Sequence, residues 1–224
     1  MNPIAPKESL ATIPPTPSGP LRVLGIDPGL ADVGYGVIDW PREGHAASLV
    51  DYGVIQTAAG ESLAARLDQI YQRLSGLIER VKPDVVAIEE LFFAKNVKTA
   101  MVVAHGRAAC ILATARSGVS VCEYTPLEIK QALTGHGRAS KIQVQMMVRA
   151  VLRLSEIPRP DHAADALAAA LCHVHLLPLQ EKIDRAKSKL GAAAPKAASA
   201  GKGPDEIDPR KLLLAQQRRR RGRR

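Results

Sequence analysis

Residues 21–29 read LRVLGIDPG, a short apolar run that ends in an aspartate followed by a Pro-Gly pair. An apolar run stopped by turn-forming residues predicts a buried β-strand. Residues 34–40 and 49–57 are the next strand-like stretches, and the links between the three are short. Consecutive strands with short links are most simply antiparallel. The fold is therefore expected to open with three antiparallel strands.

Helices and strands then alternate. Apolar residues recur every three or four positions across residues 61–81, as in an amphipathic helix, whereas residues 85–91 carry the continuous apolar run of a buried strand. A second long helix is expected over residues 97–116 and a fifth strand over residues 119–124. This order, completed by helices, predicts an α/β fold with a mixed five-stranded sheet and helices on both faces.

The last third of the domain is expected to be helical. Two capping boxes, in which the first and fourth side chains bond each other's backbone N–H, open two of these helices. They are Thr125-Pro126-Leu127-Glu128 and Ser140-Lys141-Ile142-Gln143, and the last helix is expected to begin near Pro160.

Charge is distributed unevenly along the 224 residues. The formal net charge is +9, but residues 21–180 carry 16 basic and 16 acidic side chains, whereas residues 181–224 carry 14 basic and five acidic ones. Residues 1–20 are rich in proline and have no amphipathic period. We therefore expect a disordered arm at 1–20, one folded domain at 21–180 and a basic disordered tail at 181–224.

Several classes of protein are disfavoured. Cys110, Cys122 and Cys172 are an odd number of cysteines without CxxC spacing, which argues against a disulfide framework and a structural zinc site. Residues 1–20 have no continuous apolar run of the kind expected in a signal peptide, and nowhere do about 18 apolar residues run uninterrupted, as a transmembrane helix would need. A soluble, cytoplasmic protein is expected, and its pI near 9.7 favours an anionic polymer as partner.

Four polar side chains stand where packed structure is expected. Asp27 ends the first strand and Glu89 ends the buried fourth strand. His162 and Asp165 are three residues apart, so they share one face of the last helix. An ionised carboxylate in apolar surroundings is costly unless it is paired or binds a metal, and hard oxygen ligands favour Mg²⁺ or Mn²⁺. The four residues therefore predict a divalent metal site.

Each of these residues also has a plainer interpretation. Asp27 is a common turn former before Pro-Gly, and a strand-end Glu89 is usually solvated. His162 can support the helix start through a local hydrogen bond, and Asp161, which follows Pro160, suits an N-cap better than a metal ligand. The plainer interpretations weaken when the four are taken together, because both acidic strand ends would have to converge by chance.

A set of motifs lies in one order between residues 21 and 177. They are LGIDPG at 24–29, GYGVI at 34–38, AIEELF at 87–92, AKN at 94–96, QVQ at 143–145 and HAADAL at 162–167. Together they resemble the RuvC-type Holliday-junction resolvases. The resemblance implies an RNase H-like fold, a homodimer, and nicking of two like-polarity strands of a four-way DNA junction that leaves 5′-phosphate and 3′-hydroxyl ends. It also implies two Mg²⁺ or Mn²⁺ ions per active site and points to the RuvA and RuvB branch-migration proteins as partners.

The resemblance extends to individual positions. Asp27, Glu89, His162 and Asp165 match the family's four catalytic metal ligands. Many members carry aspartate in place of His162 and others carry histidine. Asp161 is one position out of register, so the fourth ligand stays open between Asp161 and His162.

Three further residues match DNA contacts of the family: Phe92, which would stack on bases near the cut, and the lysines Lys130 and Lys141. The alternatives are a Phe92 ring that closes the core and a solvated helix face for the lysines. Residues 138–159 carry five basic side chains against one acidic, and Lys141 falls in the first turn of a capped helix, where free N–H groups also favour phosphate.

Two other functions compete with junction cleavage. The opening strand and Gly-rich turn are similar to those of the actin and sugar-kinase class, but that class needs a duplicated domain, for which about 160 folded residues leave no room. A non-catalytic junction-binding or RNA-processing relative would keep the basic helices without the metal site. For the homodimer, the helix at residues 97–116 is a candidate interface, with ordinary core packing as the alternative.

Overall fold

The computed structural model describes residues 19–41, 46–90 and 97–193; the side chains of residues 97–99 and 178–193 are left aside. By backbone contacts the chain divides into two units, residues 1–183 and 184–224. The first unit contains the whole sheet and its helices, the last of them only as far as residue 183.

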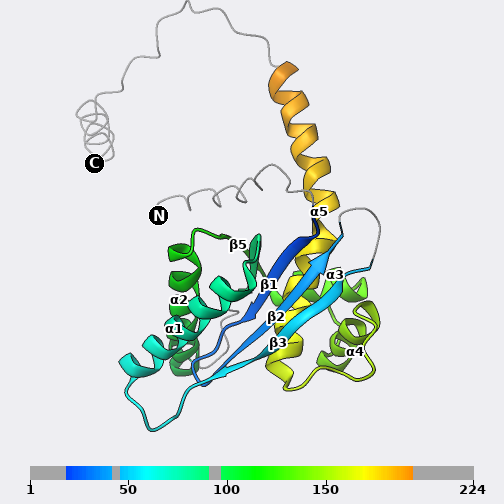
Figure 1. The fold of residues 1–224 in the computed structure, drawn as a ribbon. Helices are drawn as coiled ribbons and strands as arrows, with labels where there is room; N and C mark the ends of the chain where they lie inside the picture. Colours follow the sequence, from blue (N-terminus) through cyan, green and yellow to red (C-terminus); the bar gives the residue numbers. More distant parts are fainter. Residues whose placement is uncertain (1–18, 42–45, 91–96, 194–224) are drawn as a thin grey trace, which may run out of the picture. The chain divides into compact units, whose positions relative to one another are not determined.

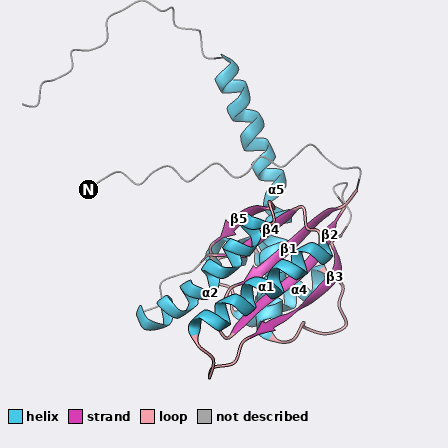
Figure 2. Ribbon diagram, turned by 60° about the vertical axis from the view of Figure 1, so that its left-hand side comes forward, coloured by secondary structure: helices cyan, strands magenta, loops and turns pink. Residues whose placement is uncertain are grey.

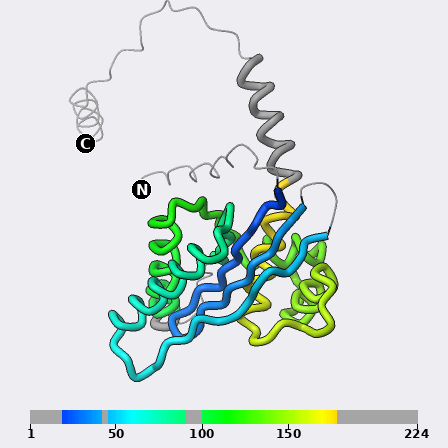
Figure 3. The backbone as a smooth tube through the Cα atoms, viewed as in Figure 1, coloured from blue at the N-terminus to red at the C-terminus, as the bar shows by residue number. Residues whose placement is uncertain are grey.

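Five strands form one mixed sheet (Figure 1) in the order β3-β2-β1-β4-β5. β1 pairs antiparallel with β2 and parallel with β4, and the outer pairs are β2 with β3, antiparallel, and β4 with β5, parallel. Their bounds are β1 Leu21–Asp27, β2 Asp32–Trp40, β3 Ser48–Gln56, β4 Val85–Glu89 and β5 Ser120–Tyr124. The predicted sheet is confirmed, and the chain crosses from β3 at one edge, through α1, to β4 beside β1 (Figure 3).

Helices cover both faces of the sheet, as predicted (Figure 2). Their bounds are α1 Leu63–Val81, α2 Val97–Arg116, α3 Pro126–Thr134, α4 Lys141–Val151 and α5 Asp161–Ala193. Both capping boxes are present, at the starts of α3 and α4, each with its two reciprocal hydrogen bonds. They therefore fix where each helix begins and which side chains fall in its first turn.

Neighbouring side chains of β1 enter two different cores because they point to opposite faces of the sheet. Val23 belongs to the core beneath α3, α4 and α5, whereas Leu24 and Ile26 belong to the core beneath α1 and α2. All three are fully buried. Each contributes roughly 1.5–3 kcal/mol of hydrophobic stabilisation, so the alternation along β1 holds both helical layers to the sheet.

The structure departs from expectation at both ends of α5. The helix continues to Ala193, into the segment that was expected to be disordered from residue 181, because that segment is rich in alanine and lysine, which favour helix. Asp161 is the first residue of α5 rather than its N-cap. The domain boundaries at 20 and 180 stay predictions. Among the described helices, none combines the length and the apolar character needed to cross a membrane.

Candidate metal centre

Two of the predicted residues follow neighbouring parallel strands. Ile26 of β1 pairs with Ile88 of β4, so Asp27 and Glu89 come next along the two strands, at the same end of the sheet. The carboxyl ends of adjacent parallel strands meet there, which is where α/β proteins commonly bind ligands. Asp27 and Glu89 thus converge for a topological reason.

Two glycine residues allow the start of α5 to pack directly against this end of the sheet. Gly34 of β2 pairs with Asp27 across the β1–β2 ladder, and a Cβ atom at Gly34 would collide with the backbone carbonyl of His162. Further along, a Cβ atom at Gly25 would collide with the carbonyl of Ala166. Because both strands lack a side chain where the helix crosses them, the first turns of α5 lie directly against the sheet.

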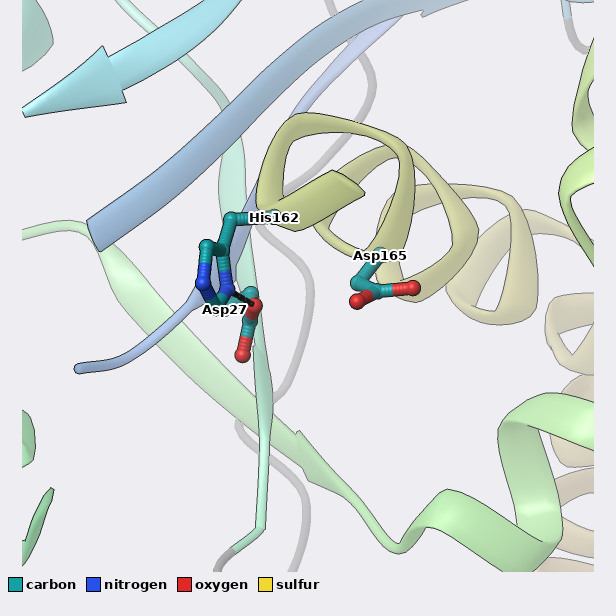
Figure 4. Close-up of side chains that lie close together, drawn as sticks. All are labelled: Asp27, His162 and Asp165. Atoms are coloured by element: carbon teal, nitrogen blue, oxygen red, sulfur yellow. Dashed lines mark hydrogen bonds and ion pairs between the residues drawn. The ribbon is translucent and has the colours of Figure 1, made fainter. Parts of the chain in front are cut away.

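The close approach places His162 beside Asp27. The His162 Nδ1 atom is 2.7 Å from Oδ2 of Asp27, and Asp165 projects from the same helix toward the same side (Figure 4). One ligand atom from each of the three residues lies within 4.8 Å of the others. The side chains of Asp27 and Asp165 are only 17% and 24% exposed, so their charges are partly shielded from water.

This arrangement fits a hard divalent cation. Two ligands on opposite sides of one Mg²⁺ lie about 4 Å apart, because each sits at about 2.0–2.1 Å from the ion. The observed spacing, at most 4.8 Å, is therefore within a small side-chain movement of a coordination shell. Carboxylate oxygens and an imidazole nitrogen are also suitable ligands for Mn²⁺.

Glu89 lies outside that group of three but belongs to the same electrostatic site. It lines a pocket of about 230 Å³ together with Asp165, Lys130 and Lys141. Burial, reinforced by the negative charges of Asp27 and Asp165, raises the pKa of Glu89 to about 7. The ionised form of this carboxyl group is therefore unfavourable in its surroundings, and a bound cation would stabilise it.

The other two polar groups respond to the same surroundings. The hydrogen bond that His162 donates to Asp27 raises the pKa of His162 above its ordinary value, against the opposing effect of burial. Burial also raises the pKa of Asp165, although Lys141 opposes this. The centre is thus acidic, partly buried and incompletely neutralised by protein groups.

Lys141 lies against the acidic centre. Its Nζ atom is 2.8 Å from Oδ2 of Asp165 and 3.5 Å from Oδ2 of Asp161. The sequence analysis identified Lys141 only as a possible DNA contact and missed its ion pairs. Asp161 and Asp165 lie one helical turn apart, and this spacing could have predicted that one basic side chain pairs with both. Phe92 lies outside the described residues.

Comparison with known proteins places the chain in a family. The family model described as "Crossover junction endodeoxyribonuclease RuvC" matches residues 23–173. The chain belongs to the RuvC family. The RuvC protein of Ruminiclostridium cellulolyticum is 52% identical over 151 residues, which are 67% of this chain and 90% of that protein. That of Moorella thermoacetica is 52% identical over 162 residues, 72% of this chain and 96% of the relative.

Solved RuvC structures share the fold. The structure of Thermus thermophilus RuvC superposes with a TM-score of 0.66 at 39% identity, covering 71% of this chain and 97% of the other. T. thermophilus RuvC in complex with a Holliday junction substrate gives a TM-score of 0.64 at 36% identity, covering 71% and 96%. The resemblance seen in the motifs, and the RNase H-like fold that it implied, are confirmed.

Proposed function

We propose that this chain is a metal-dependent endonuclease that resolves four-way DNA junctions by nicking two strands symmetrically. The observation that carries the proposal is the meeting of Asp27, His162 and Asp165, whose ligand atoms lie within 4.8 Å of one another although the residues are far apart in sequence. Membership of a family named for crossover junction cleavage, and the Holliday junction held by the T. thermophilus relative, support the choice of substrate.

The proposed cofactor is Mg²⁺ or Mn²⁺, with two ions per active site. Such a pair orients the attacking water and stabilises charge on the attacking and leaving oxygens of a phosphodiester. A carboxylate such as Asp27 could bridge two such ions. Glu89 and Asp165 would then each complete one shell, with His162 as the fourth ligand. Cleavage of this kind would leave 5′-phosphate and 3′-hydroxyl ends.

DNA would be held by basic groups next to the acidic centre. Lys130 and Lys141 line the pocket that also contains Glu89 and Asp165. Exposed arginines extend the positive surface over α4 and its flanking loops, and they are Arg138, Arg149, Arg153 and Arg159. Phosphate neutralisation by such groups supplies most of the affinity for DNA. Phe92 is proposed to stack on a base near the cut.

A symmetric cut requires two active sites, so we propose a homodimer with two-fold symmetry. Support comes from α2, where Met101, Val102 and Leu112 are 58%, 46% and 53% exposed. Large apolar side chains left in water on one helix are typical of a surface that another chain covers. RuvA and RuvB are proposed as partners and, because the relatives are bacterial, the cytoplasm as the place of action.

A cleavage assay on a synthetic four-way junction tests the proposal. With Mn²⁺, the protein is expected to make paired, symmetric nicks in the junction and to leave a linear duplex of the same sequence intact. Asp27→Asn, which removes a ligand charge while keeping its shape, should bind the junction and fail to nick it. Binding without nicking by the wild type would favour a non-catalytic relative, and ATP turnover would favour the actin and sugar-kinase class.

A further inference from the structure

One ammonium group lies between two carboxylates at the start of α5. Lys141 Nζ is 2.8 Å from Oδ2 of Asp165 and 3.5 Å from Oδ2 of Asp161. Asp165 also belongs to the group of three that could hold a cation. The lysine therefore holds one oxygen of a carboxylate that belongs to the proposed metal site.

The local structure fixes both carboxylates around the lysine. Asp161 and Asp165 are four residues apart in α5, so they lie one above the other on the same helical face. Arg159 Nη1 takes the other oxygen of Asp161, Oδ1, at 2.9 Å, which leaves Oδ2 turned toward Lys141. The capping box at Ser140 makes Lys141 the first residue of α4, so its backbone is anchored while its side chain, about half exposed, can rotate.

A divalent cation bound to Asp165 would repel an ammonium group on the same carboxylate. A double positive charge at about 4 Å from a single one is repelled by roughly 2 kcal/mol even at the dielectric constant of water, and by more in a partly buried site. This repulsion favours a movement of the lysine away from Asp165 when the ion binds. Asp161 precedes Asp165 by four residues, is not one of the three grouped ligands, and has its Oδ2 atom 3.5 Å from the ammonium group. It is therefore the second carboxylate partner of this lysine, to which the ammonium group could move.

We propose that Lys141 is an internal counter-ion that occupies Asp165 until a divalent cation binds, and that Asp161 is a positioning residue that receives the displaced lysine. The inference rests on the proposed metal site. It predicts that Lys141 competes with the metal, whereas Asp161 assists the metal only through Lys141.

Mn²⁺ titration of the full-length protein without DNA, followed by electron paramagnetic resonance of the free ion, measures the competition directly. Lys141→Met is expected to tighten Mn²⁺ binding about tenfold, in keeping with coupling energies between contacting charged groups. Lys130→Met is the matched control, because Lys130 lines the same pocket but forms no ion pair with a described residue. It removes the same charge and should change the affinity less than about threefold. Lys141→Gln serves as a second variant, and thermal unfolding of each protein checks that it is folded.

A double-mutant cycle tests the role of Asp161. Asp161→Asn should weaken Mn²⁺ binding about threefold in the wild type and leave it unchanged in the Lys141→Met background. An equal loss in both backgrounds would mean that Asp161 acts by its own charge, and equal gains in Lys141→Met and Lys130→Met would mean that only net charge matters; either result overturns the inference. Failure of the wild type to bind Mn²⁺, or binding that survives Asp27→Asn unchanged, would instead show that the proposed metal site is wrong.

Discussion

Replacing Gly34 by alanine should disable the metal centre although it changes none of the ligand side chains. The added Cβ would collide with the backbone carbonyl of His162 and lie 3.0 Å from the His162 Cβ atom. Non-bonded heavy atoms prefer about 3.5–4.0 Å, so β2 and the start of α5 would have to separate by on the order of 1 Å. The 2.7 Å contact between His162 and Asp27 spans the same interface and would be lost.

The size of the effect differs between stability and activity. Overpacking at one buried contact typically costs about 1–3 kcal/mol of unfolding free energy, which leaves most of a domain's population folded. A displacement of about 1 Å at reacting groups can reduce catalysis about 100-fold. We therefore expect Gly34→Ala to lower the nicking rate on a four-way junction far more than it lowers the denaturant midpoint.

Gly76→Ala is the matched control. Gly76 lies inside α1, and a Cβ atom there would have no neighbour within 4 Å. That change should raise stability by up to about 1 kcal/mol, because alanine favours helix over glycine, and should leave nicking unchanged. If Gly34→Ala nicked junctions at the wild-type rate, the argument that glycine spacing positions His162 would be refuted.

Three further predictions concern other parts of the domain. Burial lowers the pKa of His173 from 6.5 to about 4, so between these pH values the unfolded chain binds a proton that the folded chain does not. As the pH falls from 6.5 to 4, this residue should therefore remove up to about 3 kcal/mol of stability. Urea unfolding of the wild type and of His173→Phe as a function of pH measures the loss, and an unchanged pH dependence in the variant would contradict the prediction. Ser140→Ala removes the N-cap of α4 and should cost about 1 kcal/mol in the same assay, with a loss below about 0.2 kcal/mol counting against the capping role. Because imidazole suits Mn²⁺ better than Mg²⁺, His162→Asp should lower the ratio of the nicking rate in Mn²⁺ to the nicking rate in Mg²⁺. An unchanged ratio would show that His162 does not set the metal preference.

Much of the fold could be predicted from local sequence patterns. The strand that ends at Asp27 and the helix starts at Thr125 and Ser140 all match the structure, because apolar periodicity and capping boxes act over a few residues. Composition did not indicate where α5 ends, since it suggested disorder from residue 181 and the helix continues to Ala193. The side-chain chemistry of the candidate site could also be predicted, because Asp27, Glu89, His162 and Asp165 taken together fit a divalent metal site better than four separate, plainer roles.

The sequence by itself thus determined the order of the elements and the side chains that could hold a metal. Only the tertiary structure decided how those side chains meet: His162 lies on Asp27 because Gly34 lets α5 approach the sheet, Glu89 stands outside the group of three, and Lys141 binds Asp165. These relations depend on the packing of helices against strands distant in sequence, to which no local pattern is sensitive. A 1 Å change in that packing would leave every motif intact and alter every contact in the site.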